Sequence, residues 1–364
     1  MARPAFHRRL PCNAEDFVIS RFLLPLSAGY GAGLAVRRLA YRYGFFKSRR
    51  LNRPVISVGN LTVGGTGKTP LVMYIAERLL ERGWRPSILT RGYRRTVGGM
   101  ITIAPQTNRR ANPHETGDEA ALLAAALPQV PIVVSGNRHR AGRMAEERYT
   151  VDVHLLDDGF QHWALHRAVD VVTIDVTKDF SRGMLLPAGR FREPRSSLGR
   201  ADIVVLTRTE LGDSSTHKEI VARFNPRAEV FESTISLRGW LNAHSRVPAP
   251  ENEVLGRPAL AFCGIGNPGG FFKNLRKWGV STTLETTYRD HYRYGLGDLH
   301  RLARRARAAG AEMMVTTEKD LANFPAEWKL DIPVIACVAR LEVKNPEAFD
   351  EALIRRVHSL KFTG

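Results

Sequence analysis

Residues 57–79 read SVGNLTVGGTGKTPLVMYIAERL, and this stretch decides the fold expected for the whole sequence. It begins in the apolar run VISV (55–58), passes through a glycine cluster, and continues in a segment that places Leu71, Ile75 and Leu79 on one helix face. A glycine-rich turn between a buried strand and a helix points backbone N–H groups at an anion, and the positive end of the helix dipole adds to the attraction. The stretch therefore predicts a phosphate-binding loop; the alternative is a glycine-rich turn that binds no ligand.

The residues expected to surround the phosphates of a nucleotide are Thr62, Val63, Gly64, Gly65, Thr66, Gly67, Lys68 and Thr69. In such loops the lysine reaches the β- and γ-phosphates and the next hydroxyl binds Mg²⁺, which assigns these roles to Lys68 and Thr69. The usual pattern begins with glycine, where this sequence has Thr62, so we expect Gly64 and Gly65 to provide the freedom of the turn. No N-K-x-D guanine signature is present, which favours ATP over GTP.

The charge of the sequence points to an acidic partner. Its 364 residues carry a formal net charge of +18, which favours nucleic acid, an anionic membrane surface or a phosphorylated substrate over general solubility. The length and the 43% hydrophobic content are sufficient for two domains. The three cysteines, Cys12, Cys263 and Cys337, form no CxxC pair. Their odd number argues against a disulfide framework and favours a reducing compartment.

The N-terminal region contains an apolar run from Phe22 to Val36 that is too short to span a bilayer, which takes about twenty residues. No small-residue cleavage site follows it, so a signal peptide is not expected. We expect an interfacial helix whose cations meet anionic head groups; the alternative is a helix that packs on the core. The cations beside the run are Arg21, Arg37, Arg38, Arg42, Lys47, Arg49 and Arg50.

Unbroken apolar runs alternate with helical patterns along the rest of the chain, which predicts an α/β fold with a parallel sheet covered on both faces. We expect a P-loop NTPase-type domain at 51–225 after a membrane-associating segment at 1–50. A hairpin-like linker at 226–258 then leads to a smaller α/β domain at 259–364. The runs read as strands are 55–58, 87–90, 130–135, 151–156, 170–176 and 201–207, followed in the smaller domain by 259–266, 282–288, 313–320 and 332–338.

Two adjacent acids, Asp157 and Asp158, end the apolar strand VDVHLL, and Gln161 follows in the loop. Carboxylates at the carboxyl end of a parallel strand lie beside a phosphate loop, where they can hold Mg²⁺; the alternative is that they cap the next turn. His162 and His166 are four residues apart, a spacing seen in zinc sites, but the sequence offers no third zinc ligand at a suitable spacing.

For the other candidate site residues, a purely structural explanation stands beside the functional one. Asp118, in TGDEAALLA, is either a general base or an acid at a helix start, where capping is common. His291, in RDHYRYG, is either a functional or a surface histidine. The glycines of CGIGNPGG imitate a dinucleotide-binding fingerprint, with Asp290 at about the expected distance, but a tight strand-to-helix turn explains them better.

Taken together, the motifs resemble those of the tetraacyldisaccharide 4'-kinases, the lipid A 4'-kinases of Gram-negative bacteria. They cover residue 24 to about residue 320 in the same order. The matching stretches are PVISVGNLTVGGTGKTP, LTRGYRR, GDEAALLA, GNRHRAG, LLDDGFQHWALHR, MLLPAGRFREP, RADIVVLTR, AFCGIGNPGGFF, DHYRY and VTTEKD.

The resemblance implies an enzyme at the cytoplasmic face of the inner membrane. It implies transfer of the γ-phosphate of ATP to the 4'-hydroxyl of a tetraacyldisaccharide 1-phosphate, with Mg²⁺ as cofactor, and two α/β domains joined by a hairpin. Matched by position, Asp118 is the base and His291 its partner, while residues 62–69 hold the nucleotide, including the non-glycine start. Asp157, Asp158 and Gln161 match the Mg²⁺ region, and Arg91, Tyr93, Arg138 and His162 match positions around the sugar and its phosphate.

Two other classes of function remain as alternatives. A nucleic-acid-stimulated ATPase would need basic residues interleaved with aromatic residues, or a nucleic-acid-binding fold, and the sequence has neither; we expect no nucleic-acid partner. A non-catalytic membrane adaptor with a vestigial nucleotide site would not need to keep Lys68, Thr69, Asp157 and Asp158.

Overall fold

The computed structural model describes residues 22–93, 95–105, 112–181 and 183–359. Cys12 and residues 1–21 of the predicted N-terminal segment lie outside these ranges. Cys263 and Cys337 are buried and free.

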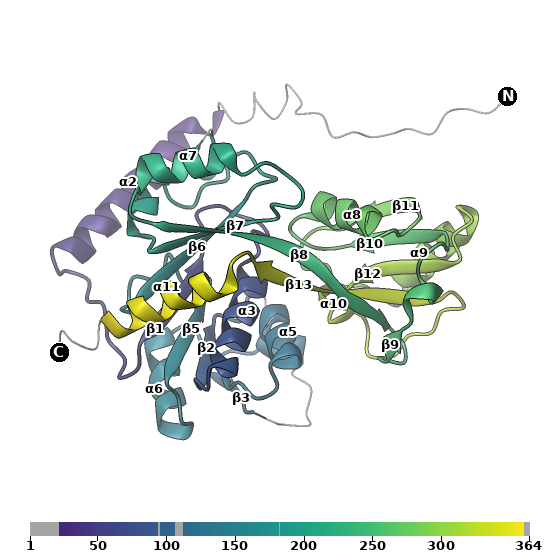
Figure 1. Cartoon of the computed structure of the whole chain (residues 1–364), viewed down its shortest axis with the longest axis horizontal. Helices are drawn as coiled ribbons and strands as arrows, with labels where there is room; N and C mark the ends of the chain where they lie inside the picture. Colours follow the sequence, from purple (N-terminus) through teal and green to yellow (C-terminus); the bar gives the residue numbers. More distant parts are fainter. Residues whose placement is uncertain (1–21, 94, 106–111, 182, 360–364) are drawn as a thin grey trace.

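Within the described residues, one mostly parallel sheet of thirteen strands runs along the length of the molecule (Figure 1). Its order is β11-β10-β12-β13-β8-β7-β6-β1-β5-β2-β4-β3, and β9 pairs with β8. The α/β class and the parallel pairing predicted from the apolar runs are confirmed. The strands are β1 Val55–Gly59, β2 Pro86–Thr90, β3 Ile101–Ile103, β4 Ile132–Val134, β5 Val153–Asp157, β6 Val169–Asp175, β7 Ile203–Thr207, β8 Glu229–Asn242, β9 Pro248–Ala249, β10 Ala259–Cys263, β11 Thr282–Thr287, β12 Met313–Thr317 and β13 Val334–Val343.

The larger part of the molecule is built around β1, which pairs in parallel with β5 on one side and β6 on the other. Helices α3 (Lys68–Glu81) and α5 (Asp118–Ala126) share a buried core with one face of this sheet. Helices α6 (Arg138–Arg148) and α7 (Ser215–Phe224) cover the other face. Because both faces are covered, the central strands β1, β5 and β6 bury every residue, which explains their unbroken apolar runs.

Two long strands join the larger and smaller parts into a single sheet. β8 pairs in parallel with β7 at one end and in antiparallel with β13 along its length. The predicted hairpin at 226–258 exists only as the short pair of β8 with β9, through Trp240 with Ala249 and Leu241 with Pro248. The main partner of β8 is thus β13, about a hundred residues further along the chain, and Figure 1 shows the two strands crossing between the parts.

The smaller part places β11, β10 and β12 in parallel beside β13. Its helices are α8 (Pro268–Lys277), α9 (Leu296–Ala308) and the short α10 (Glu318–Leu321). The last described helix, α11 (Pro346–Ser359), buries Phe349 and Leu353 in the same core as α3. The predicted smaller domain, 259–364, includes α11, whereas the packing places this helix with the larger part.

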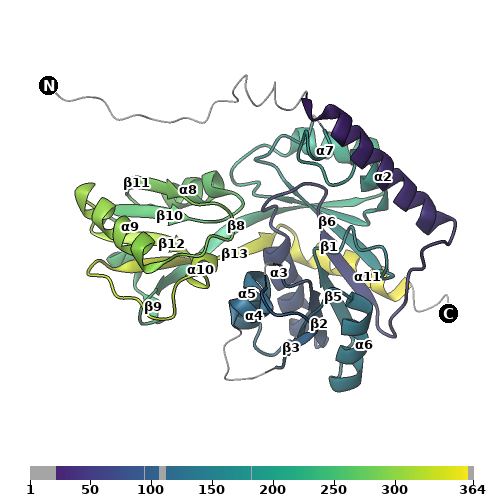
Figure 2. The same cartoon turned by 180° about the vertical axis from the view of Figure 1, so that it is seen from behind.

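Helix α2 (Leu24–Arg42) lies against the outside of the larger part, in purple in Figures 1 and 2. Ser27 and Tyr30 attach it to a loop at 185–192: the Ser27 hydroxyl donates to the Leu185 carbonyl at 3.1 Å, and the Tyr30 hydroxyl donates to the Arg192 carbonyl at 2.9 Å. In the part of the chain that the structure describes, no helix is both long and apolar enough to cross a membrane.

Candidate functional site

The loop between β1 and α3 has the geometry that its glycines predict. Gly64 and Gly67 have φ angles of 101° and 89°, in the left-handed region that favours glycine, and Gly67 is the N-cap of α3. Thr62 does not need that freedom, because it forms an antiparallel bridge with Phe191. The departure from the usual glycine start is therefore explained by a β-bridge, and Gly64 provides the turn as expected.

This loop lines a cavity of about 980 Å³ that both parts of the molecule and α2 enclose. Every residue of the loop from Val63 to Thr69 borders it. From α2 it receives Tyr30, Leu34 and Arg37, and from the smaller part it receives Gly266, Asn267, Asp290, His291 and Lys319. The predicted site residues Arg91, Tyr93, Arg138, Asp157, Asp158, Gln161 and His162 also line the cavity. Among the predicted residues, Thr62 and Asp118 do not line this cavity.

The two acids after β5 have different surroundings. Asp157 is 1% exposed, and burial together with the charges of Glu119 and Asp158 raises its pKa to about 8. Asp158 lies 3.6 Å from Lys68 Nζ and accepts a hydrogen bond from Arg192 at 2.9 Å. Burial alone raises the pKa of Asp158, but these cations outweigh it and hold the pKa below its usual range.

The oxygen atoms beside the phosphate loop fit a hard cation. Asp157 Oδ1 and Gln161 Oε1 are buried and have no hydrogen-bond partner among the described residues, and the Thr69 hydroxyl borders the same cavity. Oxygen ligands of this kind suit Mg²⁺, which usually keeps several waters and binds one or two carboxylates. Within the described ranges no three His, Cys, Asp or Glu side chains gather as metal ligands, so the spacing of His162 and His166 gains no support as a zinc site.

Asp118 and His291 meet across the two parts of the molecule. His291 Nδ1 lies 2.9 Å from Asp118 Oδ2, although 173 residues separate them in the sequence. Asp118 is the first residue of α5, but its carboxylate faces His291, and the N-cap position belongs to Gly117. The Asn323 amide, oriented with its nitrogen toward Asp118, donates to the carboxylate at 3.2 Å. Burial raises the pKa of Asp118, but the hydrogen bonds from His291 and Asn323 outweigh it and lower the pKa overall.

A group of cations surrounds His162 at the wall of the cavity nearest α2. Burial and the charges of Arg138, Arg167, Arg37 and Arg91 lower the pKa of His162 to about 4, so its imidazole is neutral at physiological pH. Burial, and next the charge of Arg91, lowers the pKa of Arg138 to about 10. Like charges held this close destabilise one another unless an anion joins them. The cluster is thus suited to a phosphate group.

Comparison with known proteins agrees with these motifs. Residues 19–358 match the family model of the tetraacyldisaccharide-1-P 4'-kinases. The chain is 38% identical over 341 residues to the tetraacyldisaccharide 4'-kinase of Geobacter metallireducens, covering 93% of this chain and 98% of that protein. It is 35% identical to the one of Geobacter sulfurreducens, covering 97% and 99%. The chain belongs to this family.

A solved structure of the family has the same fold. The crystal structure of LpxK from Aquifex aeolicus in complex with ATP is 31% identical and superposes with a TM-score of 0.73, covering 93% of this chain and 99% of that chain. The sequence prediction of family and fold is therefore confirmed.

The structure adds residues that sequence reasoning missed. Lys319 Nζ lies 2.9 Å from Asp290 Oδ1 and 3.5 Å from His291 Nε2. Its position within the family stretch VTTEKD is the one signal that could have drawn attention to it. Arg192, in MLLPAGRFREP, and Asn323 are further partners of the predicted acids. None follows from spacing, because each contacts a residue that is distant in the sequence.

Proposed function

We propose that this protein transfers the γ-phosphate of ATP to the 4'-hydroxyl of a tetraacyldisaccharide 1-phosphate, a precursor of lipid A. The observation that carries the proposal is the 2.9 Å contact between His291 Nδ1 and Asp118 Oδ2 beside a cavity that the phosphate loop lines. A phosphate loop alone serves motors, switches and kinases. A buried carboxylate with a histidine partner supplies what an alcohol acceptor also needs, which is a base for its proton.

In this proposal Asp118 accepts the proton of the acceptor hydroxyl as the oxygen attacks phosphorus. The lowered pKa keeps the carboxylate ionised at neutral pH, and the hydrogen bond from His291 fixes its orientation. Lys319, 3.5 Å from His291 Nε2, donates toward that nitrogen and favours the tautomer that carries its proton on Nδ1. His291 belongs to the smaller part and Asp118 to the larger part, so the base is complete only when the two parts are together.

The charge that develops on the transferred phosphoryl group is neutralised from the phosphate loop. Lys68 moves from its 3.6 Å contact with Asp158 to the β- and γ-phosphates, and the backbone N–H groups of residues 63–69 hold the remaining oxygens. Mg²⁺, when bound, would supply further positive charge beside the phosphates. Thr69, Asp157 and Gln161 are the residues we expect to hold it, with Asp158 beside them.

The acceptor's own phosphate is assigned to the cations around His162. The charge of Arg91 contributes to the lowered pKa of Arg138, and guanidinium groups bind phosphate through paired hydrogen bonds. Tyr93, whose ring lies 5.7 Å from that of His291, borders the same cavity between the base and this cluster. A disaccharide placed between them would have its 4'-hydroxyl at Asp118 and its 1-phosphate at the arginines.

Helix α2 is proposed to hold the enzyme at an anionic membrane surface. The helix contacts the loop at 185–192, whereas Leu26 and Val36 on the helix are 62% and 66% exposed, and Phe22, just before it, is 81% exposed. Exposed apolar side chains beside exposed cations suit the interface of a bilayer with anionic head groups. The same helix lines the cavity, which gives a lipid acceptor a direct path from the membrane. Because ATP is the donor, the cytoplasmic face of the inner membrane is the proposed location.

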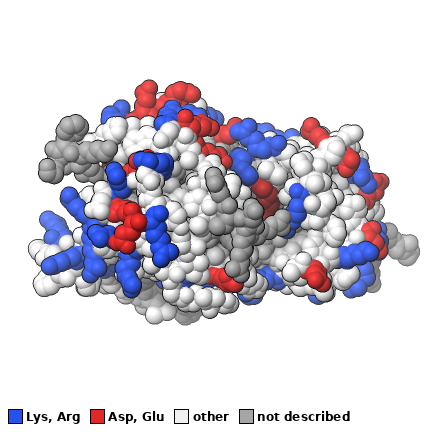
Figure 3. Space-filling view, turned by 90° about the horizontal axis from the view of Figure 1, so that it is seen from below, with Lys and Arg blue, Asp and Glu red and all other residues white. Residues whose placement is uncertain are grey.

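Basic side chains also lie elsewhere on the molecule. Figure 3 shows them on one face, mostly at the end formed by the larger part, with acidic side chains among them. Such mixing does not form a continuous basic groove on this face, so a nucleic-acid-stimulated ATPase gains no support from it.

Acceptor-dependent ATP turnover tests the proposed function against its alternatives. We expect ATP hydrolysis in detergent micelles to be slow and transfer to begin when tetraacyldisaccharide 1-phosphate is added. DNA, RNA and a disaccharide already phosphorylated at the 4'-position should not raise the rate. Stimulation by nucleic acid would support the ATPase alternative, and absence of turnover with every addition would support the adaptor.

A further inference from the structure

The glycine motif at 264–269 meets the phosphate loop backbone to backbone. Gly266 lies so close to Gly65 that a Cβ added to it would stand 2.3 Å from the Gly65 nitrogen. Gly269, in the same motif, has no atom within 4 Å of its added Cβ. The glycine at 266 is therefore required by a contact between the two parts of the molecule, in addition to forming a strand-to-helix turn. We call residues 264–267 the docking turn.

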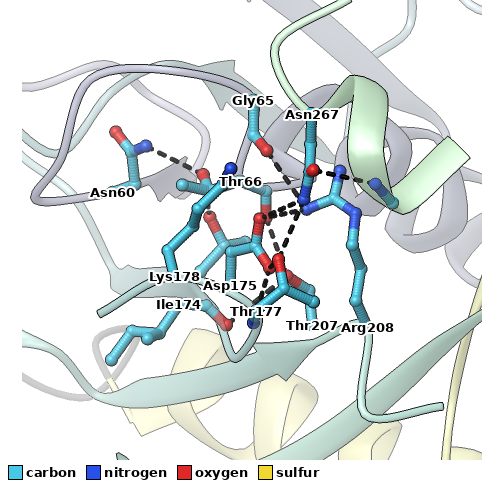
Figure 4. A network of polar contacts seen from close by, with 12 residues as sticks. Asn60, Gly65, Thr66, Ile174, Asp175, Thr177, Lys178, Thr207, Arg208 and Asn267 are labelled. Carbon is cyan, nitrogen blue, oxygen red and sulfur yellow. Dashed lines mark hydrogen bonds and ion pairs between the residues drawn. The ribbon is translucent and has the colours of Figure 1, made fainter. Parts of the chain in front are cut away.

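Asn267, the last residue of the docking turn, joins the two parts by hydrogen bonds. Its amide nitrogen donates to Asp175 Oδ2 at 2.9 Å and to the Thr177 hydroxyl at 3.0 Å, while its oxygen accepts from Gly270 N–H and caps α8. Figure 4 shows the Asn267 side chain reaching from the smaller part toward Asp175. Asn267 is 4% exposed and Asp175 is 3% exposed, so water competes little for these bonds.

Asp175 is itself tied to the phosphate loop. Arg208 donates to Asp175 Oδ2 at 2.7 Å and to the Gly65 carbonyl at 3.1 Å, and the neighbouring Thr207 hydroxyl donates to the Thr66 carbonyl at 3.0 Å. The chain of contacts thus runs from a backbone carbonyl of the phosphate loop through Arg208 and Asp175 to Asn267.

Asp157 and Asp175 end the two strands on either side of β1, and they have different roles. Asp157 ends β5 and has an oxygen without a hydrogen-bond partner among the described residues, as a metal ligand needs. Asp175 ends β6, and both its oxygens accept hydrogen bonds, Oδ1 from Thr177 and Oδ2 from Arg208 and Asn267. Asp175 is therefore an acceptor for the smaller part and not a further metal ligand.

The other end of the docking turn holds the proposed base partner. The Gly264 carbonyl accepts a hydrogen bond from His291 N–H at 3.0 Å, and the Gly264 N–H donates to the buried Asp320 at 2.7 Å. His291 has a φ of 58°, an uncommon conformation for a residue with a side chain, which must be held by its surroundings. A shift of the docking turn would therefore move His291 relative to Asp118.

We propose that Asn267 is a positioning residue, which fixes the docking turn on the phosphate loop and thereby places His291 against Asp118. This inference rests on the proposed roles of Asp118 and His291. In this inference the docking turn and Asp175 together connect the phosphate loop to His291.

The first test replaces Asn267 by Asp, which keeps the oxygen that caps α8 but places a carboxylate against Asp175. We expect kcat for lipid phosphorylation to fall about 10- to 100-fold, as small displacements of catalytic groups do, with less change in the Kd of ATP. The matched control is Asn242→Asp, at the end of β8, where the side-chain oxygen accepts from the backbone N–H groups of His244 and Ser245. The control should keep the wild-type kcat. An unchanged kcat in folded Asn267→Asp would overturn the proposal.

A second test uses the glycines and covers the case in which Asn267→Asp does not fold. Gly266→Ala must separate the docking turn from Gly65, whereas Gly269→Ala meets no atom within 4 Å. We expect Gly266→Ala alone to lower kcat by a similar factor. Equal kcat values in the two alanine variants would contradict the proposed contact.

A double-mutant cycle decides whether Asn267 acts through the histidine. If it does, Asn267→Asp should have little further effect in a His291→Ala background, because residues that act as one unit are not additive. Losses that multiply would overturn the proposed route. Failure of the proposed function is a different result, since the wild-type protein would then not phosphorylate the lipid at all.

Discussion

His291 Nδ1 lies 2.9 Å from Asp118 Oδ2, and this single contact joins a loop of the smaller part to the first residue of a helix in the larger part. The side chain of Asp118 is thereby drawn away from the helix-capping role that its position suggests. A carboxylate at a helix start is stabilised by the N-terminal dipole, and here its contact with the His291 imidazole of the smaller part also orients it.

Removing either member of this pair should disable the chemistry. We expect Asp118→Ala and His291→Ala each to lower kcat by about 10²- to 10⁴-fold, the range typical of general-base catalysis. The double variant should be little worse than the more damaged single variant. The measurement is steady-state phosphorylation of the lipid in micelles, with ATP affinity as the control for an intact nucleotide site. Losses that multiply in the double variant would show that the two residues act separately.

Lys68 should be essential to transfer but not to the fold. Among the described residues its side chain makes one ion pair, at 3.6 Å with Asp158, and Asp158 keeps its hydrogen bonds from Arg192 when Lys68 is removed. We therefore expect Lys68→Ala to melt close to the wild type and to lose nearly all kinase activity, because the γ-phosphate loses its main protein cation. A near-normal kcat in the folded variant would show that residues 62–69 are not the phosphate-binding loop of the kinase.

His162 should make the protein sensitive to acid. Its pKa is about 4 in the folded protein, against about 6.5 for a free histidine. Between these values the unfolded chain binds a proton that the folded protein excludes, so the free energy of unfolding falls as pH drops from about 6.5 to about 4. His162→Gln has no such group and should lose less stability over this range. Denaturant titrations at pH 7 and pH 5 compare the two proteins, and equal losses would contradict the assignment.

The outer side of α2 should bind anionic vesicles. Replacing Leu26 and Val36 by Asn removes apolar side chains whose burial contributes about 1.5–3 kcal/mol each when complete, so we expect vesicle binding to fall about tenfold or more. A matched control replaces the similarly exposed Leu296 and Val247 by Asn, away from α2. Co-sedimentation with anionic vesicles at low and high salt measures both variants. If the two bind equally, the membrane surface lies elsewhere on the molecule.

The elements that can be predicted are those that the local sequence determines. The strand, glycine turn and helix around Lys68 follow from contacts near in sequence, and the burial of whole strands explains why apolar runs located them. The sequence predicts a hairpin-like linker at 226–258, and the brief alternation there does not indicate a strand as long as β8. The pairing of β8 with β13 depends on residues that no local pattern connects.

The unpredicted contacts share the same physical origin. Asn267 meets Asp175 across 92 residues, and Lys319 meets Asp290 across 29. Neither pair has a spacing that fixes its geometry, because the fold alone brings the loops together. At Thr62 the sequence departs from the usual phosphate-loop pattern, which begins with glycine. The structure explains the departure, because Thr62 forms a β-bridge with Phe191.

The central claim is that this chain moves the γ-phosphate of ATP onto a lipid hydroxyl that Asp118 deprotonates. The most direct measurement follows labelled γ-phosphate in a single turnover with tetraacyldisaccharide 1-phosphate, for the wild-type protein and Asp118→Asn, and locates the new phosphate by NMR of the lipid. We predict that the wild type places the label on the 4'-oxygen and that Asp118→Asn binds ATP but leaves the lipid nearly unlabelled. Label released only as inorganic phosphate, or full transfer by the folded variant, would contradict the account.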